Sequence, residues 1–65
     1  MFEELQKNNL ISIHANRSCY DFHKVYFISQ DDDSITVLNF VSNSEVIIPK
    51  KNIEEISVHG NFLSR

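Results

Sequence analysis

The chain has 65 residues and a formal net charge of -3, because nine Asp and Glu residues outweigh six Lys and Arg residues. A domain of about 60 residues buries only about 60% of the surface of its unfolded chain, so we expect one domain over residues 1–65 with a small core. The acidic balance argues against non-specific binding to nucleic acid or anionic membranes, and the apolar runs are far shorter than a membrane span. The single cysteine allows no disulfide within the chain. A single cysteine and the lack of an apolar signal segment in the sequence are typical of a soluble, cytoplasmic protein, which is what we expect.

Residues 1–9 predict a short amphipathic helix. Phe2 and Leu5 stand three positions apart, so they would share one face of the helix. Glu3 and Glu4 would lie in its first turn, where the helix dipole favours negative charge. A helix this short is not stable alone, so its apolar face must dock on the rest of the domain.

Residues 10–58 predict about five short strands joined by polar turns. The run from Ile35 to Val41 is rich in β-branched and aromatic residues and carries apolar side chains on both faces of a pleat. We therefore expect the core to cover one face of this strand, and the N-terminal helix or a neighbouring subunit to cover the other. Pro49 cannot donate to a strand ladder, so it ends a strand.

The strand before this run is predicted by the same alternation. It places Val25 and Phe27 on one face and Phe22, Tyr26 and Ile28 on the other. The polar cluster between the two strands contains three consecutive aspartates, which favour a hairpin turn.

The predicted order of elements is a helix followed by strands, which closes most easily into a small antiparallel barrel. We expect a mainly β fold with a short N-terminal α-helix at residues 1–9, a five-stranded antiparallel barrel at residues 10–58 and a tail at residues 59–65. Closure would protect strand edges that are too apolar to be left exposed. Edges that do not close within one chain would be closed between chains.

Two segments resemble the Sm-like and Hfq-like family of small β-barrels. Residues 49–56, Pro-Lys-Lys-Asn-Ile-Glu-Glu-Ile, resemble the Tyr-Lys-His-Ala-Ile-Ser-Thr-Ile segment of the Hfq-like proteins, with Lys50, Ile53 and Ile56 in register. Residues 32–37, Asp-Asp-Ser-Ile-Thr-Val, fall where the family has an acidic residue followed by an aromatic residue and aliphatic residues.

The resemblance implies an Sm-like or SH3-like barrel that forms a homo-oligomeric ring, usually a hexamer, and binds uridine-rich RNA at its inner rim. The positions assigned to RNA binding are Lys50, Lys51, Asn52 and Thr36. Ser34 stands where the family has an aromatic that stacks on a base, and Lys51 stands where it has a histidine. The leading hypothesis is therefore a non-enzymatic, Sm-like oligomeric module that binds RNA or a regulatory partner.

The aspartates Asp31, Asp32 and Asp33 support a second hypothesis, a protein-interaction adaptor or inhibitor with an SH3-like barrel that does not bind nucleic acid. Three carboxylates at a hairpin tip would attract a basic protein partner. They lack the alternating spacing, the glycine and the distal glutamate of a calcium loop, so we expect no metal there.

Cys19, His14, His23 and His59 are candidates for zinc ligands or for a nucleophile with its base. They lack the paired-cysteine knuckle of a structural zinc site, and a small domain with one glycine has little room for an oxyanion site. We therefore predict no metal, no cofactor and no enzymatic activity. Cys19 is expected to be a small core or turn residue.

Overall fold

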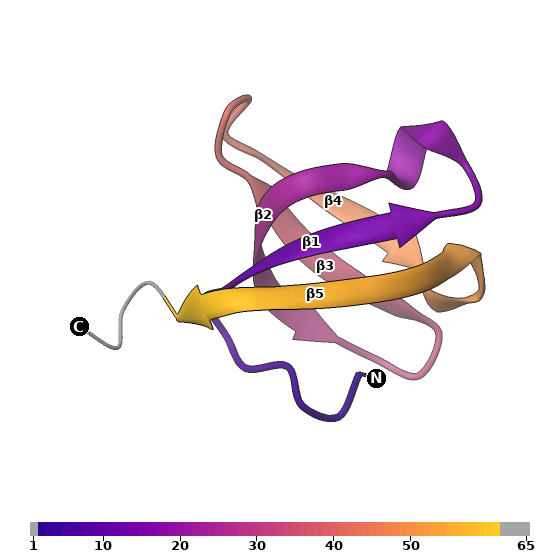
Figure 1. Cartoon of the computed structure of the whole chain (residues 1–65), viewed down its shortest axis with the longest axis horizontal. Helices are drawn as coiled ribbons and strands as arrows, with labels where there is room; N and C mark the ends of the chain where they lie inside the picture. Colours follow the sequence, from indigo (N-terminus) through magenta and orange to yellow (C-terminus); the bar gives the residue numbers. More distant parts are fainter. Residues whose placement is uncertain (1, 62–65) are drawn as a thin grey trace.

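The computed structural model describes residues 2–61, which form one five-stranded antiparallel sheet (Figure 1). The strands are β1 (Asn9–Ala15), β2 (Phe22–Gln30), β3 (Ser34–Asn39), β4 (Ser44–Pro49) and β5 (Ile53–Asn61), and the short 3-10 helices η1 (Ser18–Tyr20) and η2 (Lys50–Asn52) precede β2 and β5. The mainly β class is therefore confirmed. Residues 2–61 contain no helix of the length and apolar character that a membrane crossing requires.

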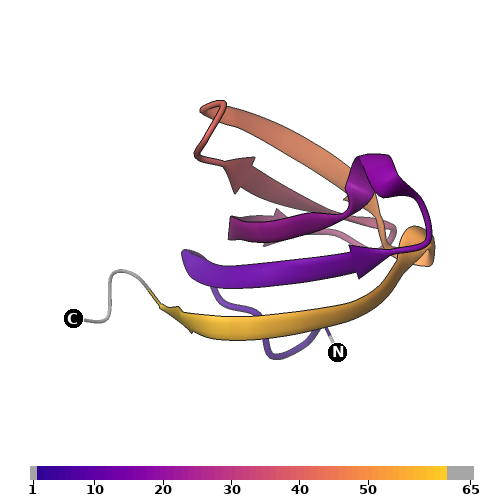
Figure 2. The ribbon, with the colours of Figure 1, turned by 45° about the horizontal axis from the view of Figure 1, so that its top comes forward.

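The strands lie across the sheet in the order β4-β3-β2-β1-β5, so β4 and β5 are its edges. Figure 2 shows that the sheet curls, with β4 along one margin and β5 along the other. Within residues 2–61 no ladder joins β4 to β5, so the predicted closed barrel is wrong and the sheet is open. Pro49, at the end of β4 nearest to β5, has no N–H with which such a ladder could begin.

The predicted N-terminal helix is also wrong. Residues 2–8 form turns, one of which is closed by the Leu5 N–H donating to the Phe2 carbonyl at 3.2 Å. Asn8 has φ 73, a left-handed conformation that no helix continues through. Its N–H donates to the Phe27 carbonyl at 2.8 Å, so the segment is anchored to β2. A segment this short gains more from these tertiary bonds and from burying Leu5 than from helical bonds of its own.

The core lies inside the curl of the sheet. Successive side chains of a strand point to opposite faces of the sheet, so every second side chain points into the core. Ile11, Ile35 and Ile48 are among these side chains and are 0% exposed. Full burial of an aliphatic side chain of this size contributes about 1.5 to 3 kcal/mol. The buried apolar side chains of the described residues are Leu5, Ile11, Ile13, Ala15, Val25, Phe27, Ile35, Val37, Ile48 and Ile53.

A β-bulge at the start of β2 corrects the predicted face of Phe22. Ile11 pairs with Val25 and Ile13 pairs with Phe22, so β2 uses one residue more than β1 between the two pairs. The extra residue returns Phe22 to the core side, where it packs against the buried cluster. Strict alternation had placed it with Tyr26 on the opposite face.

The last strand is longer than predicted. β5 continues to Asn61, and it pairs with β1 along that length. The predicted tail at residues 59–65 therefore begins inside a strand. Residues 62–65 lie outside the described part of the chain.

Candidate functional site

A groove of about 580 Å³ lies where β3 begins and β4 ends. Ser34 and Pro49 are paired across the two strands, and η2 turns the chain away directly after Pro49. The Lys50 N–H donates to the Asp33 carbonyl at 2.8 Å, which fixes η2 beside the turn between β2 and β3. The groove is lined by Asp32, Asp33, Ser34, Pro49, Lys50 and Lys51.

Asp31 shapes the turn on one side of this groove. Its Oδ1 accepts the Asp33 N–H at 2.9 Å, the Ser34 N–H at 2.8 Å and the Ser34 hydroxyl at 3.2 Å. The two backbone bonds are the main reason why the pKa of Asp31 is held below its usual value of 3.8, and the positive charge of Lys50 acts in the same direction. The carboxylate therefore organises the turn and is not directed at a partner.

The charges in the groove have both signs. Asp32 and Asp33 face the same space as Lys50 and Lys51. The Lys50 Nζ lies 4.8 Å from the centroid of the Phe2 ring, a cation–π contact that contributes about 0.5 to 1 kcal/mol at an exposed site. The groove is therefore a mixed surface rather than a basic rim.

The structure brings together only part of each predicted site. Lys50 and Lys51 share the groove with two of the three aspartates, so residues of both hypotheses meet there. Thr36 and Asn52 do not line it. Thr36 pairs with Ile47 on the opposite side of the sheet from the core, and the Asn52 carbonyl accepts the Asn16 N–H at 2.9 Å.

The side of the sheet that faces away from the core carries a group of apolar residues, the outer apolar face. Along one row Leu10 pairs with Tyr26 and Tyr26 pairs with Leu38. Phe40 is 45% exposed, and its ring centroid lies 5.1 Å from that of Tyr26. Ile47, on β4, is 65% exposed. We define the outer apolar face by these residues, Leu10, Tyr26, Leu38, Phe40 and Ile47.

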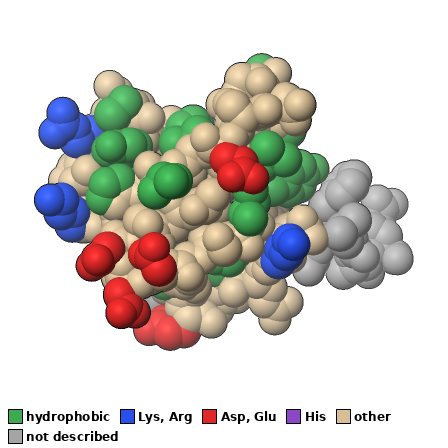
Figure 3. Space-filling view, turned by 180° about the vertical axis from the view of Figure 1, so that it is seen from behind, with side chains coloured by type: hydrophobic (Ala, Val, Ile, Leu, Met, Phe, Trp, Pro, Cys, Tyr) green, Lys and Arg blue, Asp and Glu red, His purple; other side chains and the backbone are tan. Residues whose placement is uncertain are grey.

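Figure 3 views the molecule from the side of β3 and β4 and shows hydrophobic side chains over the strands, with charged side chains among them as well as at the margins of the view. Apolar residues on both sides of the strand at residues 35–41 had predicted a cover for this face. No segment of residues 2–61 forms a helix over it. The N-terminal turns instead place Leu5 in the core.

The free edge of β4 presents unpaired backbone groups. In an antiparallel pair of strands, every second residue directs its N–H and C=O toward the neighbouring strand. The Lys50 N–H donates to the Asp33 carbonyl, so the residues of β4 at even-numbered positions direct these groups toward β3. Glu45 and Ile47, which lie between those residues, direct theirs away from the sheet. No other strand of the described chain lies beyond this edge.

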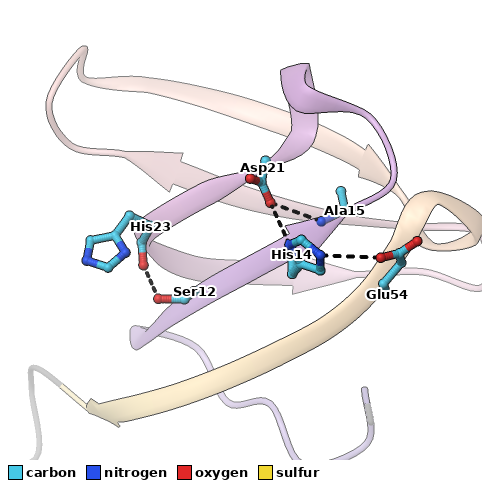
Figure 4. Close-up of polar contacts among 6 residues, drawn as sticks. All are labelled: Ser12, His14, Ala15, Asp21, His23 and Glu54. Carbon is cyan, nitrogen blue, oxygen red and sulfur yellow. Dashed lines mark hydrogen bonds and ion pairs between the residues drawn. The ribbon is translucent and has the colours of Figure 1, made fainter.

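On the other half of the sheet, His14 lies between two carboxylates (Figure 4). Its Nδ1 is 3.4 Å from Asp21 Oδ1, and its Nε2 is 3.4 Å from Glu54 Oε1. Asp21 Oδ1 also accepts the Ala15 N–H at 3.1 Å. The His14 side chain is 65% exposed, so each pair contributes only about 0 to 1 kcal/mol when the ring is protonated. Sequence reasoning missed both carboxylates, because no local spacing indicates that η1 returns Asp21 to β1.

A depression of about 360 Å³ beside His14 includes Ser12 and His23 in its lining. Ser12 Oγ donates to the His23 carbonyl and lies 2.6 Å from His59 Nε2. The direction of the hydrogen bond between Ser12 and His59 depends on the tautomer of the imidazole ring. This pair links β1 to β5.

The candidate nitrogen and sulfur ligands, for which no metal was predicted, do not form a group that could hold a metal ion within the described residues. Cys19 is exposed in η1, as expected of a turn residue. Across residues 2–61 no group of three or more His, Cys, Asp or Glu side chains is arranged to hold a metal ion. The absence of a metal, a cofactor and an enzymatic activity stays a prediction.

Comparisons with protein-family models, with curated proteins and with solved structures find no match to this chain. The resemblance of residues 49–56 to the Sm-like and Hfq-like family therefore stays a prediction. The proposed function rests on the edge of β4 and on the groove at its end.

Proposed function

We propose that this protein is a non-enzymatic protein-binding module that takes up an extended peptide segment as an additional strand along β4. The observation that supports the proposal best is the free edge of β4, where the backbone groups of Glu45 and Ile47 point away from the sheet. An added strand would pair with these groups, and main-chain hydrogen bonds of this kind provide the affinity in strand addition. The exposed side chain of Ile47 would contact apolar side chains of the partner.

The groove at the end of β4 supports the same function. A segment that pairs with Ile47 and continues past Pro49 enters the groove. There a charged side chain of either sign meets an opposite charge, because two aspartates and two lysines line the space. Strand pairing then provides affinity, and the groove provides selectivity for charged residues of the partner.

RNA binding at Lys50 and Lys51 is a second candidate, because both lysines line one groove. A phosphate in that groove would also meet Asp32 and Asp33, which repel it. Ser34 has no ring for a base to stack on, and a stacked base typically contributes about 1 to 3 kcal/mol. For these reasons we favour a peptide partner over RNA.

Selection from a random peptide library displayed on phage tests the proposal, followed by titration of a selected peptide into isotope-labelled protein. We expect the largest NMR shifts at the amides of Glu45 and Ile47. Ile47→Pro removes an N–H at the edge without breaking a bond to β3, so we expect it to weaken binding by about tenfold or more.

The matched control is Ile47→Thr, which keeps the N–H and the β-branched shape while it removes apolar surface. We expect this variant to retain most of the affinity. Equal losses in the two variants, or shifts confined to other strands, would contradict strand addition. In a parallel anisotropy titration with uridine-rich RNA, binding that is abolished by Lys50→Glu and Lys51→Glu would favour the second candidate.

A further inference from the structure

We infer that the outer apolar face is the interface of a two-fold homodimer in which two copies of this chain pack their sheets face to face. This inference does not require strand addition at β4, although the two surfaces share the exposed side chain of Ile47. It rests on the apolar side chains of that face and on two opposite charges, Lys24 on β2 and Glu45 on β4, that lie beside Tyr26 and Leu38.

The apolar part of the interface is already ordered in one chain. Tyr26 and Phe40 are in ring contact at 5.1 Å with an interplanar angle of 41°. Leu38 lies between the β2 and β4 rows, opposite Tyr26 on one side and Glu45 on the other. Ile47, 65% exposed, extends the surface to the edge of the sheet. Two sheets pack face to face through side chains of this kind at a spacing of about 10 Å.

Two opposite charges flank these apolar residues. Lys24 precedes Tyr26 by two positions on β2, so it lies on the same face of the sheet. Glu45 lies across the face on β4, where it pairs with Leu38. Both side chains are exposed, and neither forms an ion pair with another described residue.

The positions of Lys24 and Glu45 favour a second copy of this chain as the partner that covers the outer apolar face. In a two-fold interface the same patch contacts itself, so a residue on one side of the axis meets the residue that lies on the other side of the axis in the second copy. An axis that passes between Lys24 and Glu45, across Tyr26 and Leu38, sets each lysine against the glutamate of the other protomer. The ion pair then forms twice around a shared apolar centre.

A small core gives the second copy an energetic reason to bind. A 65-residue chain buries little apolar surface within itself. Contiguous apolar surface exposed on a domain of this size marks an interaction site. Face-to-face packing covers that surface and leaves the backbone groups at the edge of β4 free.

The first experiment is sedimentation equilibrium over a range of protein concentrations. We expect a reversible monomer–dimer equilibrium for the natural chain and a monomer for Leu38→Glu, which puts a charge at the apolar centre. Ser57→Glu is the matched control, because it adds the same charge at an exposed position on β5, far across the sheet order from β4. We expect this control to dimerise as the natural chain does.

The second experiment exchanges the charges and does not disturb the apolar centre. We expect Lys24→Glu alone and Glu45→Lys alone each to raise the dimer dissociation constant by about tenfold or more, because each sets like charges against each other twice. The double variant with both substitutions restores opposite charges, so we expect its dissociation constant to return to near the natural value. Circular dichroism of each variant verifies that the sheet is retained.

Three results would overturn the inference. The first is a natural chain that stays monomeric at all concentrations, which would leave the face to a different protein. The second is a dimer that Leu38→Glu leaves intact while the fold is retained, which would place the interface elsewhere. The third is a double variant as weak as the single variants, which would exclude the two-fold pairing of Lys24 with Glu45.

Discussion

Asp31 shows how one carboxylate organises the turn beside the groove. Its Oδ1 accepts the backbone N–H groups of Asp33 and Ser34 and the hydroxyl of Ser34. In the same turn the Asp31 N–H donates to the Ser34 carbonyl at 2.9 Å. The turn that leads into β3, and with it the position of Asp32 and Asp33 in the groove, therefore depends on a side chain that is itself exposed.

The turn should make stability depend on acid pH. The pKa of Asp31 is lowered in the folded chain, mainly by the hydrogen bond from the Asp33 N–H. The ionised carboxylate therefore stabilises the fold fully at pH values above its usual pKa of 3.8, and this stabilisation is lost as the pH falls through the lower pKa of the folded state. Asp31→Asn keeps an oxygen acceptor but does not titrate. We expect the stability difference between the natural chain and Asp31→Asn to shrink between about pH 5 and about pH 2.

Urea denaturation at several pH values measures this difference. Ser42→Ala, in the hairpin between β3 and β4, is the control, because it alters a turn without removing a carboxylate. A difference between the natural chain and Asp31→Asn that stays constant over the acid range would show that the turn hydrogen bonds contribute no pH dependence.

At the scale of elements, alternation predicted the strands well, and it was misleading where the chain departs from a strict period of two. The five strands and their turns follow the β-branched and aromatic runs. At the bulge β2 has one residue more than the paired segment of β1. No residue type in the sequence marks this position, so the face of Phe22 was predicted wrongly. Residues 2–8 show helical spacing, but spacing says nothing of the bond from Asn8 to the Phe27 carbonyl that replaces the helix.

Some contacts of the candidate sites can be predicted from the sequence, and others cannot. The meeting of Lys50 and Lys51 with Asp32 and Asp33 follows from the antiparallel pairing of β3 with β4, which residue counting across the hairpin can anticipate. The contact of His14 with Asp21 depends on the path of η1, which no periodicity encodes.

The N-terminal segment should act as part of the core although it is not a helix. Leu5 is 8% exposed and packs with the buried cluster. We expect Leu5→Ala to lower the free energy of unfolding by about 2 kcal/mol or more, because it removes buried methyl groups and leaves a cavity. Chemical denaturation measures the loss, and the exposed Glu4→Ala is the control from the same segment. A loss of the same small size in both variants would mean that the segment is not docked.

At the scale of the whole molecule, the sheet has two kinds of strand. β1, β2 and β3 have neighbours on both sides, whereas β4 and β5 have one neighbour each within the described chain. The core residues Ile11 and Ile13 lie on β1, between β2 and β5. Local opening therefore costs most in the middle of the sheet and least at its margins.

Hydrogen exchange should report this order. We expect the backbone amides of β1 to exchange slowest and the outward-facing amides of the two edge strands, those of Glu45 and Ile47 among them, to exchange fastest among strand residues, because no strand lies beyond either edge of the described sheet. A face-to-face dimer leaves this pattern unchanged, since it covers side chains and pairs no edge. Protection at Glu45 and Ile47 that rises with protein concentration would instead indicate assembly through the edge of β4.

The pairing of β1 with β5 also determines when the sheet can be completed during synthesis. The ladder runs from the pair Asn9–Asn61 to the pair Ala15–Ile53, so it joins the first strand of the described chain to the last one. Contacts this distant in sequence form late, because a long loop must close first. Until residues 53–61 have left the ribosome, β1 is itself an unpaired edge. The nascent chain therefore exposes two open edges, at β1 and at β4. The edge at β1 becomes paired only when β5 has been made and binds to it.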